Sequence, residues 1–475
     1  MPIPLLRIAP LAAAALLAGC ATVDIDQAVG QANRAAAEFT QGGLELSRTP
    51  EQHQRRERLA RQLLAQPLGQ AEAVQLALAN SPAFQAVVAQ GWSDMATAAQ
   101  GGRIANPVFS FERVRAGSEL EIGRLLSFGL LDLLTLPQRT ALARNASAQA
   151  QVQLTRDVVE QVGQVRQAWV RAVAAQEQLA YARQVDRSAQ ASAELARRMQ
   201  AVGNFSKLQR ARQQAFHAEA TAQLATAQHA ATAAREALVR RLGLADAQAA
   251  ELKLPERLPD LPAQPRAATA VAGAALEQRL DVRSARLQLD AAGRSQGLDL
   301  LGALVDTEVG VRRDTHFDNA EGTRTSARGW EAEIRLPLFD WGDARRASMD
   351  AQSLAAAHRY DATVRAASSQ LREGYSAYRT AYDLARHYRD EIVPLRKTIS
   401  EENVLRYNGM LIGVFELLAD HREQVGAVIA AIDAQQRFWL ADAALSSSLI
   451  GQPLAGQAAA GPARAAAATG GADAH

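Results

Sequence analysis

The chain has 475 residues, of which 48% are apolar and only 5% are aromatic. This length allows two or three domains, and the low aromatic content favours long helices over a compact mixed fold. The formal net charge is only +2, so nothing in the overall charge indicates a nucleic acid or a strongly acidic partner. A single cysteine excludes a disulfide framework.

Residues 1–19 have the organisation of a lipoprotein signal peptide. Arg7 precedes an apolar run, and the only cysteine, Cys20, directly follows Leu17-Ala18-Gly19. We therefore expect lipidation at Cys20, with ordinary cleavage beside a chance cysteine as the alternative. No later stretch reaches the ~18 apolar residues of a membrane-spanning helix. Any later crossing of a bilayer would have to use strands.

Residues 20–67 are polar and are interpreted as an N-terminal anchor and linker with one short helix near 51–64. A helical pattern follows and ends at Asn106-Pro107. The periodicity then changes to two, which predicts strands at about 107–115 and 119–129. Arg124 interrupts the apolar face of the second strand, so it indicates either an interface with lipid headgroups or an error in the register.

The next segment predicts a pair of antiparallel helices. A proline-free pattern covers 138–202, Gly203-Asn204 reverses the chain, and a second helix returns to Gly243. Residues 244–266 carry four prolines and are interpreted as a linker between repeats.

Residues 267–450 then repeat the order of elements found in 68–243: a short helix, two strands, a long helix, a reversal and a returning helix. The strands are expected at about 304–313 and 329–337, with a polar loop between them at 314–328. The long helix is expected over 341–408, about 100 Å at 1.5 Å per residue. The Ala/Gly-rich tail at 451–475 is expected to be disordered.

This pattern predicts a mainly α fold with a small transmembrane β part, built as an internal duplication of long antiparallel coiled-coil helices. Alternation of apolar and charged residues suits strands that separate lipid from a wet lumen. Four strands cannot close a barrel, so two chains with about eight strands or three with about twelve would have to share one. A small β-layer over soluble helices is the alternative.

Several segments resemble the TolC-type outer-membrane efflux factors. The matching segments are Ala71–Pro82 and Asn106-Pro107 in the first half, and Leu336–Asp340 and the second reversal, Arg406 to Leu418, in the second half. The resemblance implies a homotrimer with a twelve-stranded barrel in the cell outer membrane above a periplasmic helical tunnel. It also implies a periplasmic adaptor (membrane fusion) protein and an inner-membrane pump as partners. Lipidation at Cys20 resembles the branch that serves resistance-nodulation-division pumps.

The sequence departs from the family pattern at both reversals. The first lacks the usual Arg-Tyr opening and has Arg198-Met199 instead. In the second, Met410 occupies the usual glycine position and Gly409 precedes it. These departures leave the specificity for an adaptor open.

Two groups of site residues follow. The expected adaptor-contact tips are Gly203, Asn204, Gly409, Met410, Leu411 and Gly413, for which turn chemistry or packing between subunits is the alternative. The expected lining of the barrel lumen is Asp306, Glu308, Glu331, Glu333 and Arg335, for which a merely solvated face is the alternative.

The sequence has no motif for a catalytic triad, a phosphate-binding loop or a zinc helix. We therefore predict no enzyme activity, no cofactor, no catalytic residue and no metal site. The predicted function is a passive outer-membrane exit duct for toxic small solutes, either metal ions or drugs. A type I protein secretion duct and a non-pore periplasmic coiled-coil lipoprotein scaffold are the alternatives.

Overall fold

A computed structural model describes residues 23–268, 276–304, 307–334 and 342–453. The chain divides into two compact units, each assembled from three stretches of sequence. The first unit comprises Met1–Val159, Val239–Leu254 and Ala274–Gln370 and contains the sheet. The second comprises Glu160–Leu238, Pro255–Gly273 and Leu371–His475 and contains both helix reversals.

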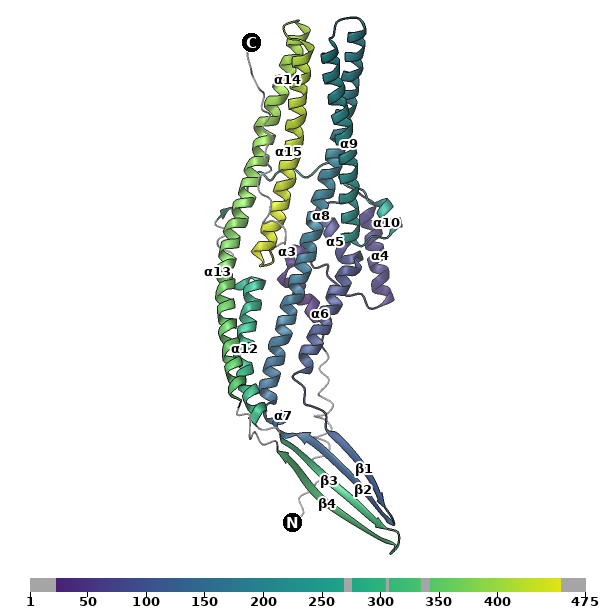
Figure 1. Cartoon of the computed structure of the whole chain (residues 1–475), viewed down its shortest axis with the longest axis vertical. Coiled ribbons are helices and arrows are strands. Elements are labelled where there is room, and N and C mark those ends of the chain that lie inside the picture. Colours follow the sequence, from purple (N-terminus) through teal and green to yellow (C-terminus); the bar gives the residue numbers. More distant parts are fainter. Residues whose placement is uncertain (1–22, 269–275, 305–306, 335–341, 454–475) are drawn as a thin grey trace. The chain divides into compact units, whose positions relative to one another are not determined.

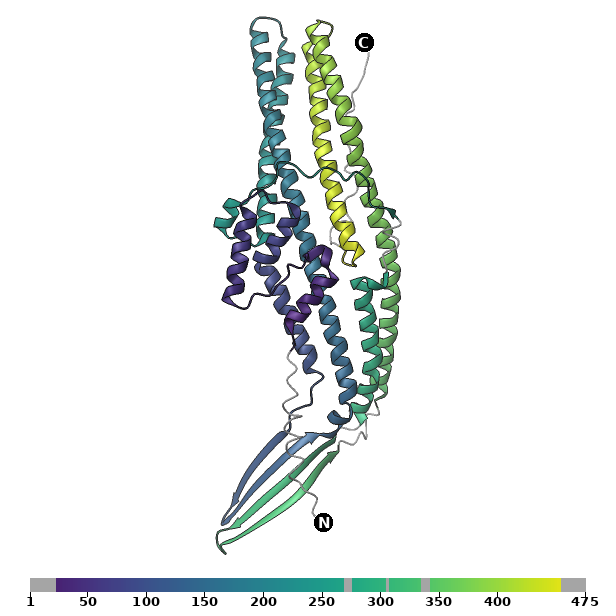
Figure 2. The same cartoon turned by 180° about the vertical axis from the view of Figure 1, so that it is seen from behind.

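The described elements are mostly helical (Figures 1 and 2). In chain order they are α2 (Ile25–Ala35), α3 (Ala37–Thr40), α4 (Pro50–Leu64), α5 (Gln70–Asn80), α6 (Pro82–Gln100), β1 (Val108–Ala116), β2 (Glu119–Gly129), α7 (Leu130–Leu134), α8 (Leu136–Ala201), α9 (Lys207–Leu242), α10 (Asp246–Glu251), the 3₁₀-helix η2 (Leu276–Gln278), α12 (Leu280–Leu304), β3 (Thr307–Asp318), β4 (Thr323–Ile334), α13 (Asp343–His387), the π-helix η3 (Tyr388–Ile392), α14 (Val393–Asn408) and α15 (Val414–Leu449). In the described part of the chain, no helix has both the length and the apolar character needed to cross a membrane.

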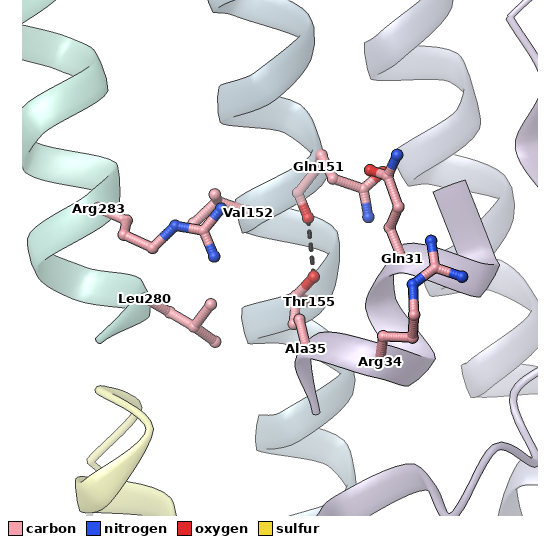
Figure 3. Close-up of a pocket in the computed structure, with 8 residues that line it drawn as sticks. All are labelled: Gln31, Arg34, Ala35, Gln151, Val152, Thr155, Leu280 and Arg283. Carbon is pink, nitrogen blue, oxygen red and sulfur yellow. Dashed lines mark hydrogen bonds between the residues drawn. The ribbon is translucent and has the colours of Figure 1, made fainter. Parts of the chain in front are cut away.

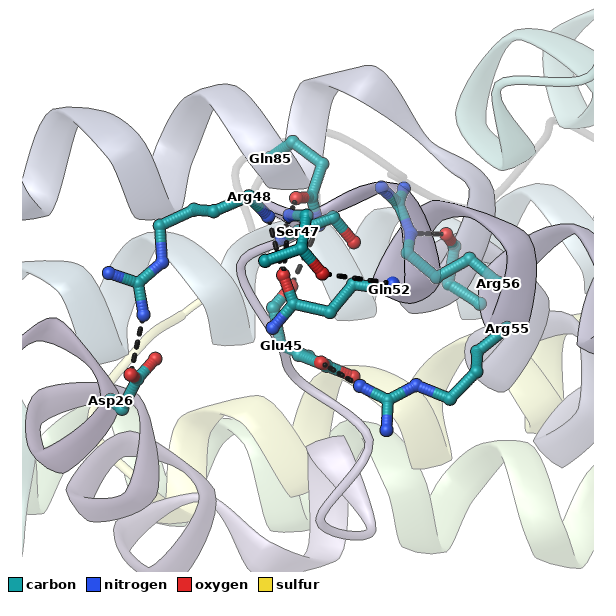
Figure 4. Close-up of polar contacts among 10 residues, drawn as sticks. Asp26, Glu45, Ser47, Arg48, Gln52, Arg55, Arg56 and Gln85 are labelled. Atoms are coloured by element: carbon teal, nitrogen blue, oxygen red, sulfur yellow. Dashed lines mark hydrogen bonds and ion pairs between the residues drawn. The ribbon is translucent and has the colours of Figure 1, made fainter.

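The N-terminal segment of the first unit is more ordered than the sequence suggested. Only one short helix was expected before residue 67, but α2 and α3 precede α4. Ile25, Ala28, Val29 and Ala32 are buried along α2, because small apolar residues three and four apart share one helix face. Polar contacts hold the connection between α3 and α4, as Figure 4 shows. Gln85 accepts from the Ser47 N–H at 2.8 Å and donates to the Glu45 carbonyl at 2.8 Å.

The helix expected before the first strand is divided in two. It breaks at Ser81, because Pro82 has no N–H and suits only the first turn of a new helix, α6. At this junction the Asn80 amide donates to the Gly243 carbonyl at 2.8 Å. The α5–α6 junction therefore contacts the residue that follows the end of α9.

The four strands form one antiparallel sheet in the order β1-β2-β3-β4. The second hairpin is longer than expected, because β3 runs to Asp318 and β4 begins at Thr323, inside the predicted loop 314–328. The tight turn explains the extra length: the Asp318 carboxylate accepts from the Ala320 N–H at 2.8 Å, and Gly322 has a φ of +65°. Polar pairs such as Thr315 and Ser326 extend the ladder, since backbone pairing does not require apolar side chains.

The core of the second unit is aromatic. Phe438 is fully buried, with ring centroids 5.6 Å from Tyr378 and 5.7 Å from Tyr382. The hydroxyl groups of these tyrosines bind the proline-rich linker: Tyr378 accepts from the Arg266 N–H at 3.0 Å, and Tyr382 donates to the Pro262 carbonyl at 3.0 Å. The linker between the repeats therefore lies against this core.

The helix expected over 341–408 contains one irregular turn. The π-helical turn η3 lies directly before α14, whose second residue is Pro394. Proline cannot donate an intrahelical hydrogen bond, and its ring clashes with the carbonyl of the residue four positions earlier. This clash accounts for the widened turn. The chain then continues as α14 to the second reversal. The proline therefore distorts the helical path without ending it.

Candidate functional site

The register of the sheet places apolar side chains in rows across one face. Phe109, Leu126, Val311 and Trp330 are successive cross-strand partners. Their exposed fractions are 63%, 46%, 63% and 79%. Phe128, Val309 and Ala332 form the neighbouring row on the same face. A contiguous exposed apolar surface of this kind is typical of a surface that contacts lipid or another protein. We call this the apolar face of the sheet.

The opposite face carries the acidic residues. Glu308 lies directly opposite Glu333, and Glu331 lies opposite Gly310. Arg312 on this face pairs with Asp314 at 2.8 Å and with Glu331 at 3.6 Å. Three of the residues predicted to line a lumen, Glu308, Glu331 and Glu333, therefore share one face. The other two, Asp306 and Arg335, lie outside the described residues, as does Cys20.

Arg124 lies on the apolar face. Its cross-strand partners are Phe111 and Arg313, and its guanidinium donates to the Thr315 hydroxyl at 3.4 Å. A register error is therefore excluded as the explanation for Arg124, and an arginine on the otherwise apolar side of β2 is a real feature of the sheet.

The two outer strands have unpaired edges. In the described residues, β1 pairs only with β2 and β4 pairs only with β3. Each outer strand therefore presents a row of backbone N–H and C=O groups without a ladder partner.

The first reversal is a tight turn between α8 and α9. Gly203 has a φ of +81°, a left-handed conformation that favours glycine, and the Asn204 N–H donates to the Met199 carbonyl at 2.9 Å. Ser206 and Gln209 then cap α9 reciprocally, at 2.7 Å and 3.2 Å. Phe205 is buried.

At the second reversal neither glycine supplies the left-handed backbone that reverses the chain. Gly409 has a φ of −79° and Gly413 a φ of −82°, both ordinary values for any residue. The left-handed residue is Met410, with a φ of +57°. The Leu411 N–H donates to the Arg406 carbonyl at 2.8 Å, and this bond closes the end of α14 with Met410 in the left-handed position.

Both reversals expose apolar side chains. Met410 is 93% exposed and Leu411 is 77% exposed. Val202, Leu208 and Leu405, which were not predicted to be site residues, are 71%, 62% and 63% exposed. Their proximity to the reversals could have been noticed in the sequence, but each also fits the apolar periodicity of a helix, which indicates burial.

Contacts between α15 and the α8–α9 pair hold the helices of the second unit together. Ser188 contacts His421 at 3.2 Å, and the Arg422 guanidinium lies 4.3 Å from the ring centroid of Phe216. Val185, Ala189, Ala220 and Val425 form an apolar cluster beside these polar contacts.

A cavity of about 350 Å³ in the first unit is lined by residues of α2, α8 and α12 (Figure 3). It contains the guanidinium groups of Arg34 and Arg283 and no carboxylate, nucleophilic cysteine or histidine. Thr155 in its wall donates to the Gln151 carbonyl of its own helix at 2.9 Å. Among the described residues, no cluster of three or more His, Cys, Asp or Glu side chains could hold a metal ion.

No protein-family model matches the sequence, and no curated protein matches it. Solved structures match it closely in fold. A membrane protein from Pseudomonas aeruginosa has a TM-score of 0.65 at 19% identity, covering 82% of this chain and 93% of that one. The outer membrane protein VceC from Vibrio cholerae has a TM-score of 0.66 at 16% identity, with 80% and 96% covered. The MtrE outer membrane channel from Neisseria gonorrhoeae has a TM-score of 0.63 at 18% identity, with 81% and 89% covered.

The chain has the fold of the TolC-type outer-membrane factors. The resemblance seen in the sequence is thereby confirmed at the level of the fold, including its mainly α-helical architecture and small four-stranded sheet. The matched structures are described as membrane proteins and channels, and none of the three as an enzyme.

Proposed function

We propose that this protein is the outer-membrane exit duct of a tripartite efflux system, a passive channel for toxic small solutes such as metal ions or drugs. The observation that carries the proposal is the open sheet, which combines one exposed apolar face with two unpaired edges. In lipid an open edge is untenable, because each unpaired backbone group costs several kcal/mol there. The fold shared with outer-membrane channels supports the same conclusion.

The open sheet explains why a homotrimer is proposed. The outer edges of β1 and β4 would pair with β4 and β1 of neighbouring subunits. Three chains would then contribute about twelve strands, wide enough for an aqueous channel, whereas about eight strands are filled by side chains. The apolar face would contact lipid, and the acidic face with Glu308, Glu331 and Glu333 would line the lumen. Lipidation at Cys20 would anchor each chain in the same outer membrane.

The two reversals are proposed as the contact surface for a periplasmic adaptor protein, which connects the duct to an inner-membrane pump. Met410 and Leu411 offer exposed apolar contacts. Gly409 and Gly413 adopt backbone conformations open to any residue, so the turn itself does not require glycine at either position. Because glycine has no side chain, a partner can approach the backbone closely at these two positions, which supports a docking role beyond turn formation. Gly203 and Asn204 would form the equivalent surface at the first reversal.

The duct would hydrolyse nothing, and the pump would supply the driving force. Opening would consist of an outward relaxation of the tip helices once the adaptor stabilises the open state. The contacts that such a motion must break or carry along are Ser188 with His421 and Arg422 with Phe216.

Conductance in planar bilayers tests the proposal. The purified full-length protein is expected to be trimeric in detergent and to conduct ions. A Val311→Asp variant on the apolar face should insert poorly, because a charge in contact with lipid is destabilising. Thr325→Asp is the matched control, since Thr325 is also exposed but lies on the acidic face. A monomeric protein without conductance would favour a coiled-coil scaffold.

A gene deletion separates efflux from type I protein secretion. Loss of resistance to metals or drugs with unchanged secreted proteins is the expected result. Normal resistance with loss of a secreted protein would support the secretion duct instead.

A further inference from the structure

The charged residues of the sheet are sorted by sign between its two faces. All eight carboxylates of the four strands lie on the acidic face: Glu112, Glu119, Glu121, Glu308, Asp314, Asp318, Glu331 and Glu333. Six of the seven arginines lie on the apolar face: Arg113, Arg115, Arg124, Arg313, Arg324 and Arg328. Arg312 is the exception and is paired with Asp314. We call the six arginines the arginine surface.

Three members of the arginine surface lie in one row. Arg124 is the cross-strand partner of Arg313, and Arg313 is the partner of Arg328. Side chains directly opposite one another have Cβ atoms about 5 Å apart, and like charges in this arrangement repel. Among the described residues none of the three forms an ion pair with a carboxylate, and the Arg124 guanidinium instead donates to the Thr315 hydroxyl. An anion from outside the chain that lies against such a row would relieve this repulsion.

The arginine row borders the exposed apolar row. Arg124 is two residues from Leu126 and Arg313 is two residues from Val311, a rise of about 7 Å along each strand. The other three arginines lie further towards the two hairpin turns. Arg324 also stacks on Phe317, with its guanidinium carbon 5.3 Å from the ring centroid. Along the strand direction this face therefore changes from apolar rows to rows that combine arginines with polar and apolar side chains.

We propose that the arginine surface binds the phosphate groups of anionic lipid headgroups, with the acyl chains of the same lipids against the apolar row. This inference rests on the proposed function, in which the apolar face contacts the bilayer. Guanidinium groups bind phosphate through two parallel hydrogen bonds, and adjacent arginines can bridge one phosphate. A phosphorylated lipid is the occupant because one molecule complements both the cationic and the apolar parts of the face, which a free phosphate ion does not.

Lipid enrichment around the purified trimer tests this assignment. The probe is a vesicle of phosphatidylcholine containing a small fraction of bis-phosphorylated lipid A, with dephosphorylated lipid A as the comparison. The wild type should retain the phosphorylated lipid selectively. Replacing Arg124, Arg313 and Arg328 together by glutamine should weaken retention on the order of a hundredfold, since each arginine near a charged lipid surface contributes about fivefold. Replacing all three by lysine should weaken it less, because the charge remains and only the two-pronged hydrogen bonding is lost.

A matched pair of single variants tests whether lipid retention depends on the face of the sheet that carries the arginine. Arg312 and Arg313 are neighbours on β3 but belong to opposite faces. Arg313→Gln should reduce retention about fivefold, whereas Arg312→Gln should leave it unchanged. Equal effects of the two variants would overturn the proposal, because lipid retention would then depend on the net charge of the sheet and not on which face carries the arginine. Complete displacement of the lipid by millimolar inorganic phosphate would also overturn it, since the site would then take a free anion.

Conductance of the same samples separates this inference from the proposed function. A wild type that conducts but shows no selective lipid retention would refute lipid binding and leave the duct intact. If the wild type fails to conduct in bilayers of every lipid composition, the proposed duct function itself is refuted. Trimer assembly of the glutamine variant is measured in the same samples, and a correctly assembled trimer shows that its loss of lipid retention does not come from misfolding.

Discussion

Replacing Met410 by glycine should stabilise the second reversal. Met410 has a φ of +57°, which brings its Cβ close to the following carbonyl oxygen. The side chain is 93% exposed, so its removal loses almost no packing within the chain. Glycine adopts the same backbone conformation without the steric conflict. The family resemblance also implies a glycine at this position.

The size of the effect follows from two opposing terms. The left-handed conformation destabilises a residue that has a Cβ atom by about 1–2 kcal/mol, through steric conflict with the backbone. Glycine loses about 0.5–1 kcal/mol of additional backbone entropy on folding. The difference favours glycine by about 0.5–1 kcal/mol, or about two- to fivefold in the local opening equilibrium.

Hydrogen exchange measures this effect where it occurs. The Leu411 amide donates to the Arg406 carbonyl across the turn, so its exchange should slow about two- to fivefold in Met410→Gly. Gly409→Ala is the control: its φ is −79°, and an added Cβ would lie 3.5 Å from the nearest atom, so exchange should not accelerate. Gly203→Ala, at a φ of +81°, should accelerate exchange of the Asn204 amide by a similar factor. Unchanged or faster exchange in Met410→Gly would refute the strain argument.

Three further predictions concern stability. Phe438→Ala should lower the free energy of unfolding in urea by about 3–5 kcal/mol because it empties a fully buried site, and the leucine variant should lose less. Arg279→Met should cost about 3–5 kcal/mol, because the Arg279 side chain is only 1% exposed and its guanidinium neutralises the largely buried Asp281. Arg379→Met, at an exposed pair, should cost under about 0.5 kcal/mol in the same assay. Burial raises the pKa of Glu177, so the folded state holds a proton that the unfolded state releases, and stability should fall as pH rises from the ordinary value of 4.5 through the raised pKa. Glu177→Gln should make the fall in stability shallower in urea titrations between pH 4 and 7, where burial also raises the pKa of Asp433 and keeps part of the slope. An unchanged slope would contradict the assignment.

The sequence predicted the faces of the sheet correctly but underestimated its length. Alternation predicted one apolar face for β2, and the register places Leu120, Ile122, Leu126 and Phe128 together on it. The extension of β3 and β4 was missed because the added residues are polar and carry no apolar alternation. Arg124 was left with two explanations until the pairing with Arg313 showed that its position in the sheet is real.

At the second reversal, composition was a poor guide to conformation. Two glycines and an asparagine predicted a turn correctly, because these residues tolerate left-handed backbone. Which residue takes the left-handed position depends on where α14 ends. That end is decided by the hydrogen bond from Leu411 to Arg406, and it places Met410, the residue least suited to it, in the strained position.

The sequence by itself determined the element types, their order and the duplication, because helical and strand periodicities are properties of neighbouring residues. Only the tertiary structure decided which side chains from distant segments lie opposite one another. Strand register is a long-range choice, and a shift of one residue would move every side chain of a strand to the other face. The separation of eight carboxylates from six arginines exists only in the observed register.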